Sequence, residues 1–279
     1  MPASRARRIG CLRRSAGLLL LLGGAILSSC ARDSAPAART EVSLFAAASL
    51  VDAFGALESA FEHANPDIDV RATFAGSQVL RLQIEQGATA HLVASANEGH
   101  MRALVDGGFV DTSRPLGSNE LVLIVPHDNP AGITSFRDLP SAQRIVIGTP
   151  GVPVGSYTRE LLGAAAEALG PDFERAVLSR VVSEESNVRL VRAKVELGEA
   201  DAAVVYRTDA LASDRVRLIE IPTDYRVRAR YLIGVTTEAS SPDSRRTGIS
   251  EAVERLLAFA YSEEGTSIMA RHGFGEADR

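Results

Sequence analysis

The stretch Glu41–Ala64, EVSLFAAASLVDAFGALESAFEHA, indicates the fold class of this chain. Its residues up to Ala46 have the composition of a strand, and the alanines that lead to Ser49 turn the chain. Apolar residues then recur at the spacing of an amphipathic helix, which Asn65-Pro66 ends: Leu50, Phe54, Leu57 and Phe61. A strand that turns directly into such a helix is the building unit of an α/β fold.

Strand and helix patterns alternate in the same way through the rest of the chain. Strands are expected at 69–74, 91–94, 121–125, 143–147, 202–206 and 227–235. Helices are expected at 79–86, 100–107, 158–169, 188–197, 250–261 and 264–271. This alternation predicts a mainly parallel sheet with helices on both faces. In such sheets the strand-to-helix turns gather at the carboxyl ends of the strands, where open α/β folds bind ligands.

Four of these turns have small or backbone-exposing residues where a helix starts. Ser49 is expected at the cap position of the first helix, and Ser77 follows Phe74-Ala75-Gly76 in the second turn. The third and fourth turns are 151–157, GVPVGSY, and 184–188, EESNV. Free N–H groups and the positive end of the helix dipole favour an anion at each start. A single serine there is most simply a helix cap, but four such starts predict an anion site.

The chemistry of these turns excludes several classes of function. The sequence contains no phosphate-binding loop, no dinucleotide fingerprint, no H-E-x-x-H metal pair and no G-x-S-x-G elbow. The turns carry no lysine, and Arg189 lies just inside the fourth helix, so an arginine clamp for an organic carboxylate is not evident. Neutral hydroxyl and N–H donors suit a small, fully ionised anion. We therefore expect a binding protein and not an enzyme.

Five strings of the sequence, in this order and spacing, resemble the molybdate-binding proteins of ABC importers. They are FAAASL at 45–50, FAGSQVLRLQIEQGA at 74–88, VPVGSYTRE at 152–160, the helix start VR at 188–189 and AAVVYRTDA at 202–210, and the resemblance covers nearly all of 41–279. It implies a type 2 periplasmic binding protein with two α/β lobes, each a mixed, mainly parallel sheet flanked by helices. The lobes are expected at 41–120 plus 226–279 and at 121–225, with the ligand in the cleft between them.

The resemblance also implies the ligands of the oxyanion, which are the side chains or amides of Ser49, Ser77, Val154, Val188 and Tyr206. The residues alone leave Tyr206 open as a core tyrosine, and Asn187 is the alternative to Val188. Ser156 and Tyr157 are expected to support the site from behind. Two departures from the family pattern are His91, in place of an acid, and Gln78, in place of a small residue.

The implied function is capture of molybdate or tungstate and delivery to an ABC permease, by a monomer that needs no cofactor. Molybdenum would be present only within the oxyanion. Sulfate or a small organic acid as the ligand, or a sensor lipoprotein without a transport role, remain alternatives. The formal net charge of −5 at pH 7 argues against a nucleic-acid partner, which needs a basic surface.

The N-terminal segment has the pattern of a secretory signal. Basic residues are followed by the apolar run 17–26 and by Leu27-Ser28-Ser29-Cys30, which resembles a bacterial lipobox. We therefore expect a signal peptide at 1–29, a lipid on Cys30, a tether at 30–40 and an extracytoplasmic, membrane-anchored protein. An ordinary signal peptide and an uncleaved anchor helix are the alternatives. No cysteine follows Cys30, so the folded part has no disulfide.

Overall fold

The structure is a computed structural model, and it describes residues 39–277. The expected signal peptide, the lipid on Cys30 and most of the expected tether lie outside the described residues. Within 39–277, none of the helices combines the length and apolar character that a membrane crossing requires.

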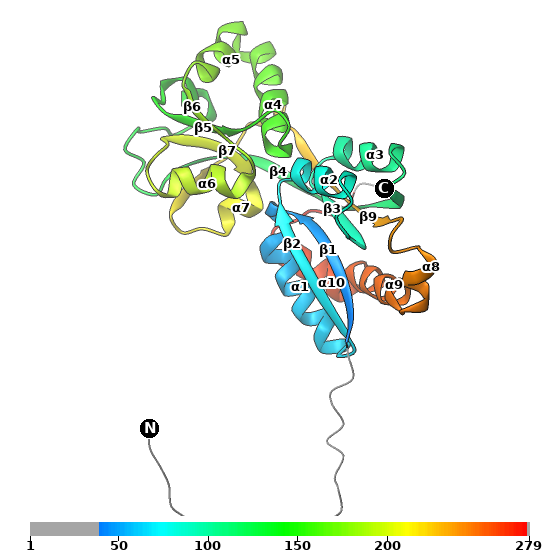
Figure 1. The fold of residues 1–279 in the computed structure, drawn as a ribbon. Helices are drawn as coiled ribbons and strands as arrows, with labels where there is room; N and C mark the ends of the chain where they lie inside the picture. Colours follow the sequence, from blue (N-terminus) through cyan, green and yellow to red (C-terminus); the bar gives the residue numbers. More distant parts are fainter. Residues whose placement is uncertain (1–38, 278–279) are drawn as a thin grey trace, which may run out of the picture. The chain divides into compact units, whose positions relative to one another are not determined.

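A central sheet of nine strands organises the described residues (Figure 1). Its order is β2-β1-β3-β9-β4-β7-β5-β6, and β8 pairs with β4. The strands are β1 (Thr40–Ala47), β2 (Ile68–Ala75), β3 (Leu92–Ser95), β4 (Val110–Pro126), β5 (Ile145–Gly148), β6 (Val181–Glu185), β7 (Ala202–Tyr206), β8 (Val216–Ile219) and β9 (Arg228–Thr236). The expected α/β class is therefore confirmed.

Parallel and antiparallel pairings are equally common in this sheet. The parallel pairs are β1 with β2 and β3, and β5 with β6 and β7. Every antiparallel pair among the described residues includes β4 or β9. The sheet is thus more mixed than the alternating sequence pattern predicts, because two long strands run against their neighbours.

Strand β4 belongs to two groups of strands. Its residues Val110–Glu120 pair with β9, whereas Leu121–Pro126 pair with β7 and β8. We call β1, β2, β3 and β9 with their helices the first lobe, and β5 to β8 with their helices the second lobe. A continuous strand therefore links the two lobes through its backbone.

Helices cover both faces of the sheet in each lobe (Figure 1). In the first lobe, α1 buries Ala53, Phe54, Leu57 and Phe61, as the helical spacing predicts. The helices are α1 (Val51–Ala64), α2 (Ser77–Glu85), α3 (Glu98–Asp106), α4 (Pro153–Leu169), α5 (Pro171–Leu178), α6 (Val188–Glu196), α7 (Arg207–Leu211), α8 (Pro242–Arg246), α9 (Ile249–Ala260) and α10 (Glu263–Arg271). Short 3₁₀ helices are η1 (Ala48–Leu50), η2 (Phe136–Ser141) and η3 (Thr223–Tyr225).

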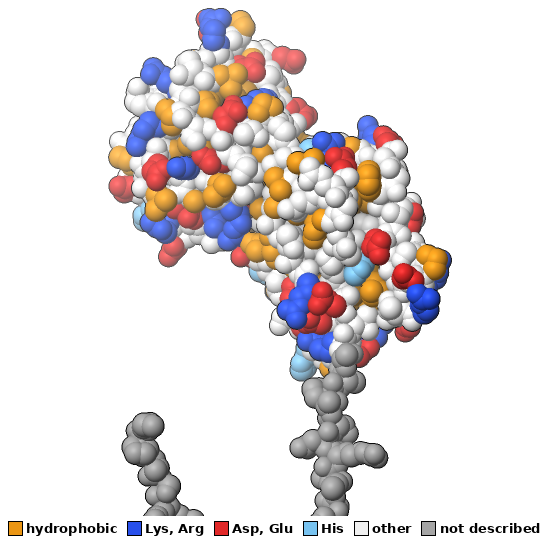
Figure 2. All heavy atoms as spheres, in the orientation of Figure 1, with side chains coloured by type: hydrophobic (Ala, Val, Ile, Leu, Met, Phe, Trp, Pro, Cys, Tyr) orange, Lys and Arg blue, Asp and Glu red, His pale blue; other side chains and the backbone are white. Residues whose placement is uncertain are grey.

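The surface carries charges of both signs side by side. Figure 2 shows basic and acidic side chains interspersed over the face in view. Many of them form ion pairs, such as Arg144 with Asp201 at 2.7 Å and Arg159 with Glu184 at 2.6 Å. Burial raises the pKa of the Asp201 carboxyl group, but the hydrogen bonds from the Arg144 side chain and from the backbone N–H groups of Arg144 and Gln143 lower it below the usual value.

Candidate anion site

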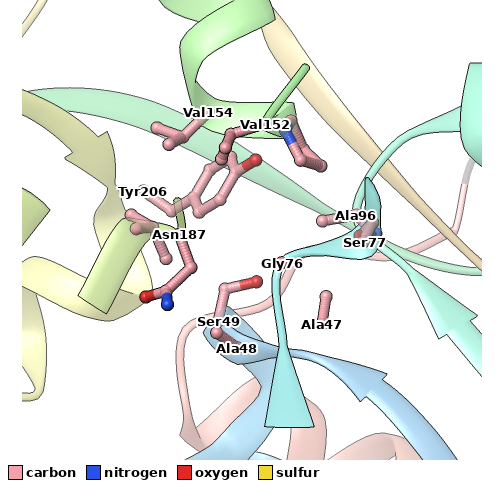
Figure 3. A pocket seen from close by; sticks show the side chains of 12 residues that line it. Ala47, Ala48, Ser49, Gly76, Ser77, Ala96, Val152, Val154, Asn187 and Tyr206 are labelled. Carbon is pink, nitrogen blue, oxygen red and sulfur yellow. Dashed lines mark hydrogen bonds between the residues drawn. The ribbon is translucent and has the colours of Figure 1, made fainter. Parts of the chain in front are cut away.

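One pocket brings together the five residues that the sequence predicts as ligands (Figure 3). The space is about 210 Å³, including solvent at its mouth. It is lined from the first lobe by Ala47, Ala48, Ser49, Gly76, Ser77 and Ala96, and from the second by Val152, Pro153, Val154, Asn187, Val188 and Tyr206. None of these lining residues carries a formal charge, so the pocket offers hydroxyl and amide groups to a ligand.

The topology explains why distant turns meet in this pocket. β1 and β2 are parallel and in register, with Ala47 opposite Ala75, so Ser49 and Ser77 each follow their strand by two residues. In the second lobe, β5 and β6 end together, with Gly148 opposite Glu185. The turns to α1, α2, α4 and α6 therefore leave the sheet at the carboxyl ends of parallel strands, where open α/β folds bind ligands.

Ser49 faces the pocket from η1, and its expected role as a helix cap is wrong. The positions before η1 and α1 are Ala47 and Leu50, and neither caps its helix through a side chain. The Ser49 side chain is buried, and its Oγ lies 2.8 Å from the hydroxyl oxygen of Tyr231 in β9. A 3₁₀ turn after the strand, which the spacing of apolar residues does not reveal, moves the helix start beyond Ser49.

Ser77 is the first residue of α2 and is almost completely buried. Its Oγ accepts the backbone N–H of Ala96 at 3.1 Å. Since a serine hydroxyl has one proton to donate, this bond leaves the Ser77 proton available to a ligand. Ala96, which follows β3, lines the pocket and was not predicted from the sequence.

Val154 and Val188 lie in the first turns of α4 and α6. N–H groups in the first turn have no acceptor within their own helix, and the helix dipole makes them good anion donors. α4 begins at Pro153, five residues before the predicted start at Thr158, because proline is favoured in the first turn of a helix. The side chain of Asn187 caps α6 by accepting the Leu190 N–H at 3.1 Å. This cap occupies the Leu190 N–H but not the N–H of Val188, which can serve a ligand.

Tyr206 ends β7, and Figure 3 shows its ring in the pocket beside Val154 and Asn187. The residue is 1% exposed, and burial raises the pKa of its hydroxyl well above the usual value, so it stays a donor. Tyr231 lies near enough to contribute to this shift, yet among the described residues the Tyr206 hydroxyl has no hydrogen-bond partner of normal geometry. A buried hydroxyl without a partner costs free energy, so a ligand that accepts its proton is favoured.

Several contacts join the lobes around the pocket. Gln78 Nε2 donates to the Ser186 carbonyl at 2.8 Å, and His100 Nε2 lies 2.8 Å from the Gly151 carbonyl oxygen. Arg189 pairs with Asp52 at 2.8 Å. Gln78 is one of the two residues that depart from the family pattern, and its side chain contacts the other lobe.

The remaining predicted residues lie outside the pocket lining. Ser156 is exposed, and the hydroxyl of Tyr157 accepts the backbone N–H of Arg230 at 3.4 Å. His91 is buried in the first lobe, where Nδ1 accepts the Ser43 N–H at 2.9 Å, and burial lowers the pKa of its ring. Within residues 39–277, no group of three or more His, Cys, Asp or Glu side chains is arranged to hold a metal ion.

The fold and this donor-lined pocket define a two-lobed binding protein for a small anion. The family model described as bacterial extracellular solute-binding protein matches residues 42–275, and the chain belongs to this family.

Two relatives cover nearly the same length as this chain. The molybdate-binding protein ModA of Mycobacterium tuberculosis is 32% identical over 97% of this chain and 99% of its own. YvgL of Bacillus subtilis, named as a candidate ABC transporter substrate-binding lipoprotein, is 31% identical over 91% and 93%.

Solved structures are also similar. The substrate-binding domain of a candidate molybdenum ABC transporter from Clostridium difficile matches with a TM-score of 0.63 and 25% identity, over 86% of this chain and all of that one. The sulfate-binding protein SubI of Mycobacterium tuberculosis matches with a TM-score of 0.74 and 19% identity, over 86% and 88%. The similarity to SubI, at 19% identity, concerns the fold alone.

Proposed function

We propose that this protein captures molybdate or tungstate outside the cytoplasm and delivers it to an ABC permease. The observation that carries the proposal is the unpartnered, buried hydroxyl of Tyr206 in a pocket whose other polar groups are neutral donors. The relatives named as molybdate-binding proteins support the choice of oxyanion. Binding, without a chemical step, is the role that this set of groups supports.

The proposed ligands of the oxyanion are the hydroxyls of Ser49, Ser77 and Tyr206 and the backbone N–H groups of Val154 and Val188. Each hydrogen bond to a charged ligand contributes roughly 1.5–3 kcal/mol net. Five such bonds, less the cost of association, correspond to micromolar to nanomolar affinity. Neutral donors also avoid the desolvation of a buried cation, which an arginine or lysine in the same place would require.

We further propose that binding closes the two lobes by hinge bending. The proposed lobes are 41–120 with 226–279, and 121–225. The change of pairing partner between Glu120 and Leu121 in β4 supports a hinge there, because one strand serves both lobes. The closed form, with Gln78, His100 and Arg189 in contact across the cleft, would be the form that a permease recognises.

The proposed anchor is a lipid on Cys30, after cleavage of residues 1–29. The lipobox-like sequence before Cys30 supports it, and so does the description of the Bacillus subtilis relative as a lipoprotein. The membership in an extracellular solute-binding family supports an extracytoplasmic location.

Calorimetric titration of the full chain, purified in detergent, tests the proposed ligand. Molybdate, tungstate, sulfate and phosphate are titrated separately under the same conditions. We expect micromolar or tighter binding of molybdate and tungstate, with little or no heat from sulfate and phosphate. A folded protein that binds sulfate more tightly than molybdate would replace the proposed ligand, and one that binds none of the four would overturn the proposal.

A further inference from the structure

The direction of one buried hydrogen bond decides what Ser49 can offer to a ligand. Ser49 Oγ and Tyr231 Oη lie 2.8 Å apart, and either atom can be the donor by geometry alone. If Ser49 donates to Tyr231, its oxygen faces the pocket as an acceptor and repels an oxyanion. If Tyr231 donates, Ser49 has its own proton free for the ligand.

The surroundings of Tyr231 favour the second direction. Ser49 Oγ is the hydrogen-bond partner of normal geometry that the described residues offer to the Tyr231 hydroxyl. If Ser49 donated this bond, the buried Tyr231 proton would have no acceptor among the described residues, whereas a bond that Tyr231 donates satisfies that proton.

The Tyr231 ring is held in place for this role. The residue is fully buried, and its ring packs edge-on against Phe274 with centroids 5.2 Å apart and against Tyr206 at 5.9 Å. Burial raises the pKa of the Tyr231 hydroxyl well above its usual value, so the hydroxyl retains its proton at physiological pH. A fixed, protonated hydroxyl is a reliable donor.

We propose that Tyr231 is a positioning residue of the oxyanion site, whose hydroxyl donates to Ser49 and directs the Ser49 proton into the pocket. Ser77 has the same arrangement, because its oxygen accepts the backbone N–H of Ala96 from behind. Both serines are thereby held as donors. This inference rests on the proposed function, since it assigns Ser49 to the oxyanion.

A pocket that offers only donors discriminates by protonation state. Molybdate and sulfate are fully deprotonated near neutral pH and can accept at every oxygen, whereas phosphate keeps at least one proton that needs an acceptor. Without the Tyr231 hydroxyl, Ser49 is free to turn its oxygen towards such a proton. Tyr231 therefore contributes to rejection of protonated oxyanions as well as to affinity.

A double-mutant cycle on the full chain in detergent tests this inference. Molybdate affinity is measured for the wild type, Tyr231→Phe, Ser49→Ala and the double variant. We expect Tyr231→Phe to weaken binding about tenfold in the wild type and to have almost no effect in the Ser49→Ala background. We also expect millimolar phosphate to compete with molybdate in Tyr231→Phe but not in the wild type.

One further variant separates positioning from packing. Tyr225→Phe removes another buried tyrosine hydroxyl that does not line the pocket, and it should leave molybdate binding unchanged.

Equal losses from Tyr231→Phe with and without Ser49 would overturn the inference while leaving the proposed function intact. Continued exclusion of phosphate by folded Tyr231→Phe would overturn the selectivity role. A wild type that binds no molybdate would overturn the proposed function and this inference together.

Discussion

Oδ2 of Asp52 in α1 lies 2.8 Å from Nη1 of Arg189 in α6, so an ion pair joins the first lobe to the second beside the pocket. Both side chains are partly exposed, and pairs of this kind contribute about 0.2–1 kcal/mol. The position of the Asp52–Arg189 pair matters more than its strength, because an ion pair between the lobes would favour the proposed closed form over an open one. The pair also places a cationic group beside Val188, a proposed ligand, and outside the lining of the pocket.

We predict that Arg189→Gln weakens molybdate binding by up to about fivefold, with a smaller loss at high salt. Asp52→Arg alone should weaken closure by repulsion, and the charge-reversed double variant Asp52→Arg with Arg189→Asp should regain part of that loss. Calorimetric titration at two salt concentrations measures both effects. The matched control is Arg175→Gln, which breaks an exposed pair with Asp172 inside α5 and should not change affinity. Loss without recovery in the double variant would argue against an interlobe role.

Gly76 approaches the second lobe so closely that a larger residue should hold the lobes apart. A Cβ at this position would lie 2.5 Å from the Ser186 carbonyl oxygen, and the backbone φ of −61° is otherwise suitable for alanine. We predict that Gly76→Ala lowers molybdate affinity at least tenfold and leaves the free energy of unfolding nearly unchanged. Titration and small-angle scattering with and without molybdate check affinity and closure.

The control for Gly76 is Gly163→Ala in α4, where an added Cβ meets nothing within 4 Å. This variant should bind molybdate like the wild type and gain a few tenths of a kcal/mol to about 1 kcal/mol in helix stability. If Gly76→Ala also binds and closes normally, then the two lobes do not meet at Ser186 in the bound state.

His91 should make the protein less stable as the pH falls through 6.5. Its Nδ1 accepts the Ser43 N–H, so protonation would break this bond, and burial lowers its pKa below the ordinary value of 6.5. The unfolded chain therefore binds more protons than the folded one just below pH 6.5, and stability is lost as the pH falls. One histidine contributes at most about 1.4 kcal/mol per pH unit.

Denaturant unfolding between pH 7.5 and 5.5 measures this effect. We expect His91→Gln to lose less stability over that range than the wild type, whereas His63→Gln, at the exposed end of α1, should follow the wild type. The lowered pKa of His100, which burial causes, acts in the same direction and remains in both variants. Identical slopes for His91→Gln and the wild type would contradict the assignment.

Replacing Cys30 should release the protein from the membrane. We predict that wild-type cells incorporate labelled fatty acid into the protein and that Cys30→Ser abolishes the label and moves the chain to the soluble extracytoplasmic fraction. Fractionation and the mass of the mature chain measure both results. A Cys30→Ser protein that stays in the membrane with residues 1–29 attached would favour the anchor-helix alternative.

The sequence predicts most of the buried framework because apolar runs indicate it directly. The run AAVVY at Ala202–Tyr206 forms a completely buried strand, as expected of β7. The first half of β4, from Val110 to Glu120, was not predicted, because it is polar and contains Pro115 and Gly117. Its pairing with β9 depends on tertiary contacts. The helix α5 and the polar edge strand β6 were not predicted either.

The residues of the candidate site also fall into those that the sequence predicts and those that it does not. Strand-to-helix turns with small residues predicted which segments meet in the pocket, and the parallel register explains the meeting. Tyr231 was not predicted, because it lies 182 residues from Ser49 in a strand that looks like any other core strand. No local sequence pattern predicts a contact between residues so far apart in the chain. Ala96 was missed for the same reason, since its contribution is a backbone N–H.

Tyr206→Phe should have opposite effects on affinity and on stability. The Tyr206 hydroxyl is buried without a partner among the described residues, so its removal should leave the ligand-free protein equally stable or up to about 1 kcal/mol more stable. The same change should weaken molybdate binding by about 1.5–3 kcal/mol, because a hydrogen bond to the oxyanion is lost. Ser77→Ala is the comparison, since it also removes the acceptor of the Ala96 N–H and should lower both quantities. Thermal unfolding without ligand and calorimetric titration separate the two patterns. A Tyr206→Phe protein that is less stable yet binds normally would mean that Tyr206 is a core residue and that the oxyanion is held by other groups.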